Sequence, residues 1–173
     1  MVVGHDEESF AEFYEASWRP CLRAVAAATG NMAGAEDQVS EAFARAWSAW
    51  AKVSRHPAPR AWVVRTALNV GSSWWRRRSR ELPFADRDVA ALESQGTGLD
   101  VTVLTALRRL PSRQREVIVL RVFLDLDIRT TAEELEIAPG TVRAHLSRAV
   151  ATLRDELTQT DVREEDPCPT TTR

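Results

Sequence analysis

Lysine is almost missing from this chain. Of its 173 residues, 23 are lysine or arginine, and Lys52 is the only lysine. The positive charge is therefore almost entirely guanidinium, which can form bidentate hydrogen bonds with phosphate groups and base edges. A codon bias in the source genome explains the imbalance equally well. The bias towards arginine is compatible with a nucleic-acid partner but does not establish one.

Cysteine is also scarce. Cys21 lies in an apolar stretch and Cys168 in a stretch rich in proline and threonine, far from each other in the sequence. Two isolated thiols make neither a metal-binding quartet nor a disulfide framework. We therefore expect no metal ion, and a reducing compartment fits this cysteine content.

Long apolar runs and catalytic motifs are absent from the sequence. No run approaches the ~18 apolar residues of a membrane span, and the N-terminus lacks a basic region followed by an apolar one. There is no phosphate-binding loop, no metal-ligand spacing and no nucleophile motif. The sequence thus predicts a cytoplasmic protein that is not an enzyme, needs no cofactor and does not insert into membranes.

The charge is unevenly distributed along the chain. The net charge is only −2, because 25 acidic residues nearly balance the basic ones. Yet residues 60–80 contain six arginines and no carboxylate, whereas residues 161–166 are mostly acidic. A local basic strip of this kind can attract a polyanion even when the whole chain is close to neutral.

Apolar residues recur at steps of three and four, and strand patterns are sparse, so we predict an all-α protein. A first helical unit is expected over 9–80. Its first helix should begin at Ser9, which has capping-box spacing with Glu12, and should end at Gly30. A second helix is predicted over 35–51, with a core stripe that includes Trp47, and a third from Pro59.

A second helical unit is expected over 101–157. The stretch 81–100 contains proline and glycine and loses periodicity, so it reads as a flexible linker. Pro111 should end a helix that begins at Val101, and Ser112 should cap the next one. Residues 158–173 are polar and have no apolar face, so we predict a disordered tail.

The end of the second unit has the pattern of a helix-turn-helix. A short helix over 130–136, with Asp127 as its cap, is followed by the turn residues Pro139 and Gly140 and by a longer helix with an apolar stripe. Opposite that stripe are the candidate DNA-reading residues Thr141, Arg143, Ala144, His145, Ser147 and Arg148. A helix-turn-helix places such residues in the major groove. An ordinary helical hairpin with a solvated polar face has the same pattern.

The third helix of the first unit combines aromatic and basic residues. Trp62, Arg65, Asn69 and Arg76 share one face, which suits base stacking and backbone contacts on a single strand. Two alternatives remain open from the residues alone. The tryptophans can simply pack the domain, and a basic aromatic helix can also lie on a membrane surface.

Both units resemble parts of one family. LPSRQREVIVLRVFLDLDIRTTAEELEIAPGTVRAHLSRAVATL is similar to region 4 of extracytoplasmic-function sigma factors, and AEDQVSEAFARAWSAW with PRAWVVRTALNVGSSWWRRRSR resembles their region 2. The WWRRR ending resembles the actinobacterial, SigE-like subgroup. The resemblance implies a subunit that docks on core RNA polymerase and directs promoter-specific initiation at the −10 and −35 elements of promoter DNA.

The resemblance also implies roles for particular residues. For the −35 element it points to Arg143, Ala144 and Ser147 as base-reading positions, with Arg148 as a phosphate contact. For the −10 element it points to the loop 52–59 and to Trp62, Arg65, Asn69, Arg76, Arg77 and Arg78. For polymerase docking it points to Asp37, Gln38, Glu41 and Arg45.

The sequence departs from the family pattern at two places. Glu136 stands just before the turn, where members often carry glycine, and Ser73 stands where they often carry an acidic residue. An anti-sigma factor is a further possible partner. The competing hypotheses are a stand-alone dimeric helix-turn-helix regulator, which would bind a palindrome without polymerase, and a decoy that occupies polymerase without initiating transcription.

Overall fold

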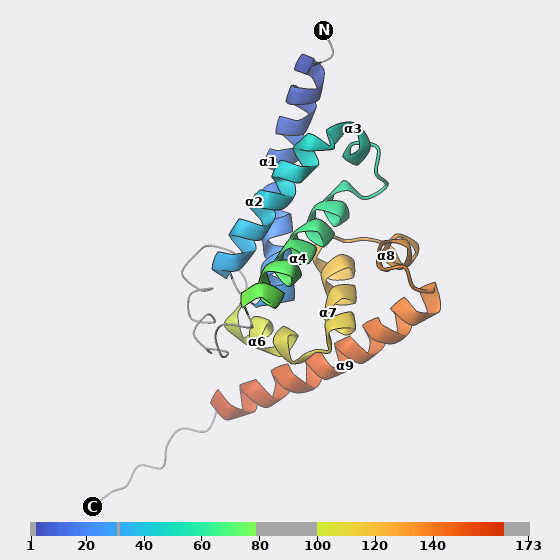
Figure 1. The fold of residues 1–173 in the computed structure, drawn as a ribbon. Helices are drawn as coiled ribbons and strands as arrows, with labels where there is room; N and C mark the ends of the chain where they lie inside the picture. Colours follow the sequence, from blue (N-terminus) through green and yellow to red (C-terminus); the bar gives the residue numbers. More distant parts are fainter. Residues whose placement is uncertain (1–2, 31, 79–99, 165–173) are drawn as a thin grey trace, which may run out of the picture.

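The computed structural model describes residues 3–30, 32–78 and 100–164 (Figure 1). All regular elements in these ranges are helical, as predicted. They are α1 (Val3–Thr29), α2 (Met32–Ser48), α3 (Trp50–Val53), α4 (Pro59–Arg78), α6 (Val101–Arg109), α7 (Ser112–Ile118), η2 (Val119–Phe123), α8 (Ile128–Leu135) and α9 (Pro139–Glu164). None of the helices in the described ranges combines the length and apolar character that a membrane span needs.

Helix α1 begins earlier than the sequence pattern predicts. It starts at Val3, so the predicted capping role of Ser9 is wrong. Ser9 lies inside the helix, and its hydroxyl accepts a hydrogen bond from the indole N–H of Trp50 (3.3 Å). The acidic residue Asp6 lies in the first turn of α1, where a negative charge stabilises a helix that starts at Val3. The predicted end at Gly30 is confirmed, with φ of +67°.

The predicted helix over 35–51 is divided into α2 and α3. The break is at Ala49, whose φ of −117° and ψ of 22° depart from helical values. Phe43 and Trp50 are buried as predicted, but the prediction that Trp47 belongs to the core is wrong, since it is 43% exposed. Its ring packs against Phe10 at a centroid distance of 5.0 Å, at the edge of an aromatic cluster.

Helix α4 begins at Pro59, as predicted, and packs closely on α2. One close contact is at Gly71, where an added Cβ atom would lie 2.6 Å from Cδ of Gln38. Ala61 and Val64 are buried on the same side of the helix. The absence of a side chain at Gly71 therefore leaves room for the end of the Gln38 side chain between the two helices.

The boundaries in the second half follow proline and aspartate caps. Asp100 caps α6 by accepting a hydrogen bond from the backbone N–H of Thr102 (2.7 Å). Ser112 does not cap α7, contrary to the prediction, because the extended Pro111 occupies the N-cap position and Ser112 is the first helical residue. Helix α7 continues into the π-helical turn η2.

Helices α8 and α9 form the predicted helix-turn-helix around a small core that α7 completes. Val117, Ala132 and Val142 are buried together there. Helix α9 runs to Glu164, so the prediction of a disordered tail is wrong for residues 158–164. No glycine or proline interrupts the chain between Leu157 and Pro167, and helix can therefore propagate. The remaining predicted tail and the linker before Asp100 lie outside the described residues.

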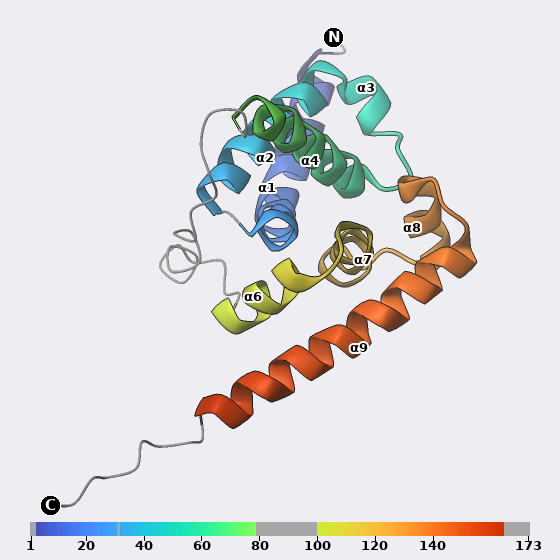
Figure 2. The ribbon, with the colours of Figure 1, turned by 60° about the horizontal axis from the view of Figure 1, so that its bottom comes forward.

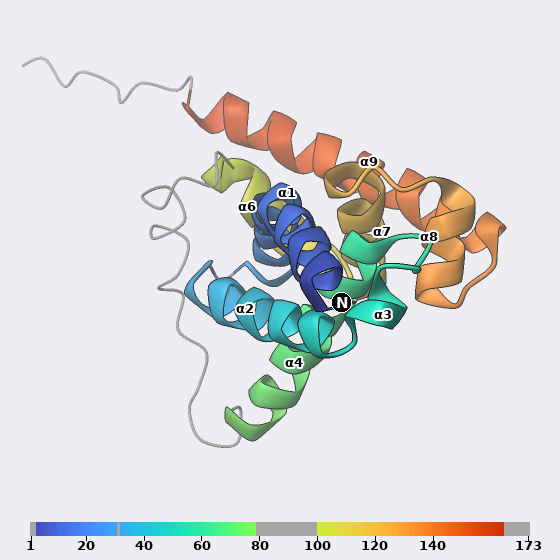
Figure 3. The ribbon, with the colours of Figure 1, turned by 90° about the horizontal axis from the view of Figure 1, so that it is seen from above.

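The two halves pack against each other across α1. Figures 2 and 3 show α1 between α2 and α4 on one side and α6 and α7 on the other, with α9 along the outer face. One continuous core cluster includes Val25, Val39 and Val64 of the first half together with Leu104 and Leu107 of the second. The halves therefore share a core in addition to the covalent connection between them.

Candidate nucleic-acid interface

The first turns of α9 present a polar face to solvent. Thr141, Arg143, Ser147 and Arg148 are exposed there. Val142 and Ala149 are fully buried on the opposite side of the helix. This division follows from helical spacing, because burying one apolar stripe turns the other side outward. Four of the six residues predicted to read DNA therefore share an accessible surface.

Ala144 and His145, the other two predicted reading residues, are half-buried. Nδ1 of His145 is buried and has no hydrogen-bond partner within the part of the chain that the structure describes. Its ring is thus partly turned towards the protein, and the sequence pattern did not predict this orientation. The small side chain of Ala144 leaves room for close approach to the helix backbone.

A side-chain cap begins α8, and a tight turn joins its end to α9. Asp127 accepts a hydrogen bond from the backbone N–H of Thr130 (2.7 Å). This bond holds the pKa of the Asp127 carboxyl below its ordinary value. Glu136, which stands where family members often carry glycine, has a φ of +55° and a ψ of +43°, in the left-handed region that strains a residue with a side chain. The backbone N–H of Ile137 then bonds to the carbonyl of Ala132 (3.0 Å).

The predicted −10 face of α4 is only partly accessible. Trp62 and Arg65 are half-buried, whereas Asn69 is exposed. The guanidinium of Arg65 lies 3.6 Å from a carboxylate oxygen of Glu134 and 3.6 Å from one of Glu136. The predicted residues Arg76, Arg77 and Arg78 lie at the end of α4, and their side chains are outside the described part of the structure.

Arg60 belongs to the basic strip but has a structural role. Its Nε donates to the hydroxyl of Ser17 (3.1 Å), and its Nη2 donates to the carbonyl of Ala16 (2.9 Å). These contacts fasten the start of α4 to α1. Charge and spacing along the sequence could not separate this anchoring arginine from one that faces a ligand.

Three of the four predicted docking residues lie on the exposed side of α2. Asp37, Glu41 and Arg45 are exposed, and Glu41 pairs with Arg45 at 2.8 Å. Gln38 differs, because it is half-buried against Gly71 and its side-chain oxygen is buried without a hydrogen-bond partner among the described residues. Gln38 therefore packs between helices, whereas the other three form an accessible charged surface.

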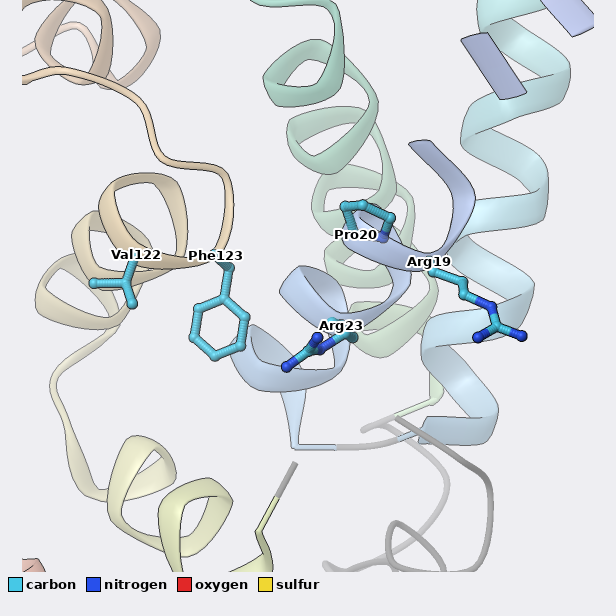
Figure 4. A pocket seen from close by; sticks show the side chains of 5 residues that line it. All are labelled: Arg19, Pro20, Arg23, Val122 and Phe123. Carbon is cyan, nitrogen blue, oxygen red and sulfur yellow. The ribbon is translucent and has the colours of Figure 1, made fainter. Parts of the chain in front are cut away.

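A cleft of about 460 Å³ lies between α1 and η2. It is lined by Arg19, Pro20, Arg23, Val122 and Phe123. Figure 4 shows Arg23 extending towards the ring of Phe123 across this cleft. The lining comes from both halves of the chain, so the shape of the cleft depends on how those halves pack.

The described residues offer no obvious chemistry of metals or thiols. Burial raises the pKa of the Cys21 thiol to about 12, which keeps it protonated and unreactive. Within residues 3–30, 32–78 and 100–164, no group of three or more histidine, cysteine, aspartate or glutamate side chains could hold a metal ion. The surfaces described above consist instead of exposed guanidinium, hydroxyl and carboxylate groups.

Two family models match the chain. Sigma-70 region 2 matches residues 14–81, and sigma-70 region 4 matches residues 100–153. The RNA polymerase sigma-E factor of Streptomyces antibioticus is 30% identical over 131 residues, covering 74% of this chain and 73% of the relative. The sigma-E factor of Streptomyces coelicolor is 29% identical over 159 residues, covering 88% of each chain.

A solved structure shares the fold. It is the sigma factor RpoE of Bartonella quintana, in complex with the anti-sigma factor NepR, and it matches with a TM-score of 0.69 and 24% sequence identity. The match covers 87% of this chain and 98% of that one. At this identity the similarity establishes the helical architecture. With both sigma-70 regions in order and relatives at this level of identity, the chain belongs to the extracytoplasmic-function group of sigma-70 RNA polymerase sigma factors.

Proposed function

We propose that this chain binds core RNA polymerase and directs it to promoters, using its first half for the −10 element and its second half for the −35 element. It supplies recognition and contributes no catalytic group, in line with a family of initiation factors. The observation that carries the proposal is the exposed polar face at the start of α9, held on a helix-turn-helix whose opposite face is buried.

The −35 contact uses the N-terminal turns of α9. Arg143 can form a bidentate pair with the N7 and O6 atoms of guanine in the major groove. Ser147 and Ala144 lie beside it as base-reading positions, and Arg148 is suited to a phosphate. Thr141 is placed at the first turn, where short polar side chains can also reach the DNA backbone. Half-buried His145 contributes less to this surface.

Replacing Arg143 with alanine should relax promoter choice at one base pair of the −35 element. The expected loss of discrimination is about 1–3 kcal/mol, since one bidentate pair disappears. Transcription from promoters carrying each base at every −35 position measures the effect. Arg154→Ala is the matched control, because Arg154 is exposed further along α9, away from the reading turns. Unchanged base preference in Arg143→Ala would contradict the groove assignment.

The −10 contact uses the basic and aromatic face of α4. Trp62 offers a stacking surface, Asn69 an amide, and Arg65, Arg76 and Arg77 guanidinium groups for the backbone of a melted strand. Of the predicted range 52–59, residues 54–58 form the loop that leads from α3 into the same helix. This arrangement fits recognition of unpaired bases better than reading of a closed duplex.

Docking on core polymerase uses the exposed side of α2. Asp37, Glu41 and Arg45 form its charged surface. Gln38 supports this surface indirectly, by filling the space beside Gly71. Because a polymerase subunit acts where transcription occurs, the chain works in the cytoplasm.

The decisive test is run-off transcription from a promoter library with core polymerase and the purified chain. We expect defined start sites that require both components, and weak binding of promoter duplex by the chain alone. Tight binding without polymerase would instead support a stand-alone regulator. Polymerase binding without specific transcripts would support a decoy.

The second protein partner that we propose is an anti-sigma factor. The Bartonella quintana sigma factor of similar fold was solved in complex with such a protein. We propose that a partner of this kind binds the chain and competes with polymerase. Co-purification of the chain from its own cells, followed by displacement with core polymerase, tests that competition.

A further inference from the structure

Four charged or polar side chains meet where the first half of the chain faces α8. Nε2 of His56 lies 3.5 Å from Oε1 of Glu134. The two terminal nitrogens of Arg65 lie 3.6 Å from Oε2 of Glu134 and 3.6 Å from Oε1 of Glu136. We call these four residues the interdomain latch, because every one of the three contacts crosses from the first half to the second.

The hydrogen bond at Nδ1 of His56 fixes which ring nitrogen faces Glu134 with a proton. Its Nδ1 accepts a hydrogen bond from the backbone N–H of Ala58 (3.1 Å). A neutral imidazole that accepts at Nδ1 carries its proton on Nε2. Nε2 is the atom that faces Glu134, so the ring presents an N–H group to that carboxylate.

Glu134 is held in place by its burial. Its side chain is 9% exposed, and a buried carboxylate is costly unless cationic or hydrogen-bonding partners offset its lost hydration. His56 and Arg65 are the partners that the structure places beside it. Moving α8 away from α4 would expose Glu134 to water and also free Arg65.

Glu136 joins the latch from a backbone conformation that disfavours it. At φ of +55°, glycine would be free of steric strain and glutamate is not. Glycine would lack the carboxylate that approaches Arg65. The chain therefore has at this position a residue that opposes the local geometry and supplies the second acidic partner of one guanidinium.

We propose that Glu134 and Glu136 are an intramolecular inhibitor of DNA binding, in which their carboxylates cover Arg65 and His56 and occupy the places that DNA phosphates would take. Carboxylates and phosphates are both acceptors that suit the guanidinium fork. In the free chain the latch is closed, and α8 must leave α4 before this face meets DNA. The inference rests on the proposed function in assigning that face to the −10 element.

The strength of the contacts suits a reversible device. Arg65 remains 39% exposed and Glu136 81% exposed, so water and salt screen their attraction. The shared apolar core is independent of these charges and holds the remainder of the interface. Opening can therefore be local to α8, and raising the salt concentration should favour it.

A distance measurement on the free chain tests the latch without DNA or polymerase. Dyes are attached to cysteines introduced by Ser54→Cys and Ala138→Cys in a chain that also carries Cys168→Ser. They report the separation between the end of α3 and the turn before α9. Cys21 is buried and does not react with the dye. At low salt, the double variant Glu134→Gln with Glu136→Gln should have a longer mean dye separation and a broader distribution of separations than the unmodified chain. High salt should change the separation in the unmodified chain in the same direction. If the double variant and the unmodified chain had the same dye separation and the same response to salt, the proposal would be overturned.

The matched control is Glu133→Gln. Glu133 lies on the same helix but pairs within it, with Arg129 at 3.7 Å, so its loss should leave the distance unchanged. Glu136→Gly separates charge from strain, because it removes the carboxylate and also relieves the positive φ. It should open the latch as far as Glu136→Gln does while giving the more stable protein.

Binding of a fluorescent single-stranded oligonucleotide provides the functional readout. Releasing the three contacts of the latch should raise the affinity of the free double variant about three- to tenfold over the unmodified chain, and Glu133→Gln should not. Removing two negative charges can also raise affinity non-specifically. An equal gain in a chain that already carries Arg65→Ala and His56→Ala would therefore overturn the latch. Promoter-specific transcription with polymerase tests the proposed function separately.

Discussion

Replacing Trp50 with alanine should destabilise the protein by about 3–5 kcal/mol, the range for truncating a buried aromatic side chain. Trp50 is 7% exposed. Its ring lies 5.2 Å from that of Phe10 and 5.1 Å from that of Phe13, measured between centroids. Its indole N–H also donates to Ser9. The substitution therefore removes packing and leaves a cavity between α1 and α3.

Trp47→Ala is the control for this prediction. Trp47 is 43% exposed and lies three residues before Trp50, in the same aromatic cluster. Its loss should cost less, because 43% of its surface already contacts water and truncation removes less buried apolar area than at Trp50. Chemical denaturation followed by circular dichroism measures both values. Equal destabilisation by the two substitutions would contradict the claim that burial determines how much each tryptophan contributes to stability.

Replacing Leu104 with alanine should destabilise the chain by about 2–5 kcal/mol, as for other fully buried leucines. Leu104 is 0% exposed and belongs to the core cluster that both halves share. For a protein of this length, such a loss corresponds to a fall of about 4–20 °C in Tm. The shared core also predicts that both halves unfold in one transition.

Val122→Ala is the matched control for the shared core. Val122 is 63% exposed on the same second half, beside the cleft in Figure 4. Its truncation should change Tm little. Unfolding followed separately by tryptophan fluorescence, which reports on the first half, and by hydrogen exchange in α9 tests cooperativity. Two transitions at different temperatures in the unmodified chain would contradict a shared core.

The shared core has a consequence for promoter binding. Elements named −10 and −35 lie about 25 base pairs apart, which is about 85 Å along B-form DNA. A compact chain of this length has a radius of gyration of only about 16 Å. We therefore expect the halves to separate on polymerase, and the interdomain latch is one of the contacts that this separation breaks.

Local sequence patterns predicted the helices well where a strong local signal was present. Pro59 starts α4, Gly30 ends α1, and Asp127 caps α8, all as expected. The errors at Ser9 and Ser112 share a cause. Serine is a favourable N-cap residue, but in both cases its neighbours determine where the helix begins. Acidic residues before Ser9 allow α1 to start earlier, and Pro111 occupies the N-cap position of α7.

The candidate surfaces were predictable to a similar extent. Helical spacing was sufficient to place Arg143 and Ser147 outward and Val142 inward. The resemblance placed Gln38 with the docking residues, whereas packing against Gly71 partly buries it. Periodicity identifies the exposed face of a helix, but it does not show which residues at the edge of that face are covered by a neighbouring helix.

By itself, the sequence determined the all-α class, the helix-turn-helix, the arginine-rich character of α4 and the resemblance to sigma factors, because these depend on residues close together in the chain or on recognisable motifs. Only the tertiary structure decided that Arg60 anchors α1, that Leu104 joins the core of the first half, and that Arg65 faces Glu134 and Glu136. Such contacts join residues far apart in the chain, and they follow from how the helices pack, which no local period encodes.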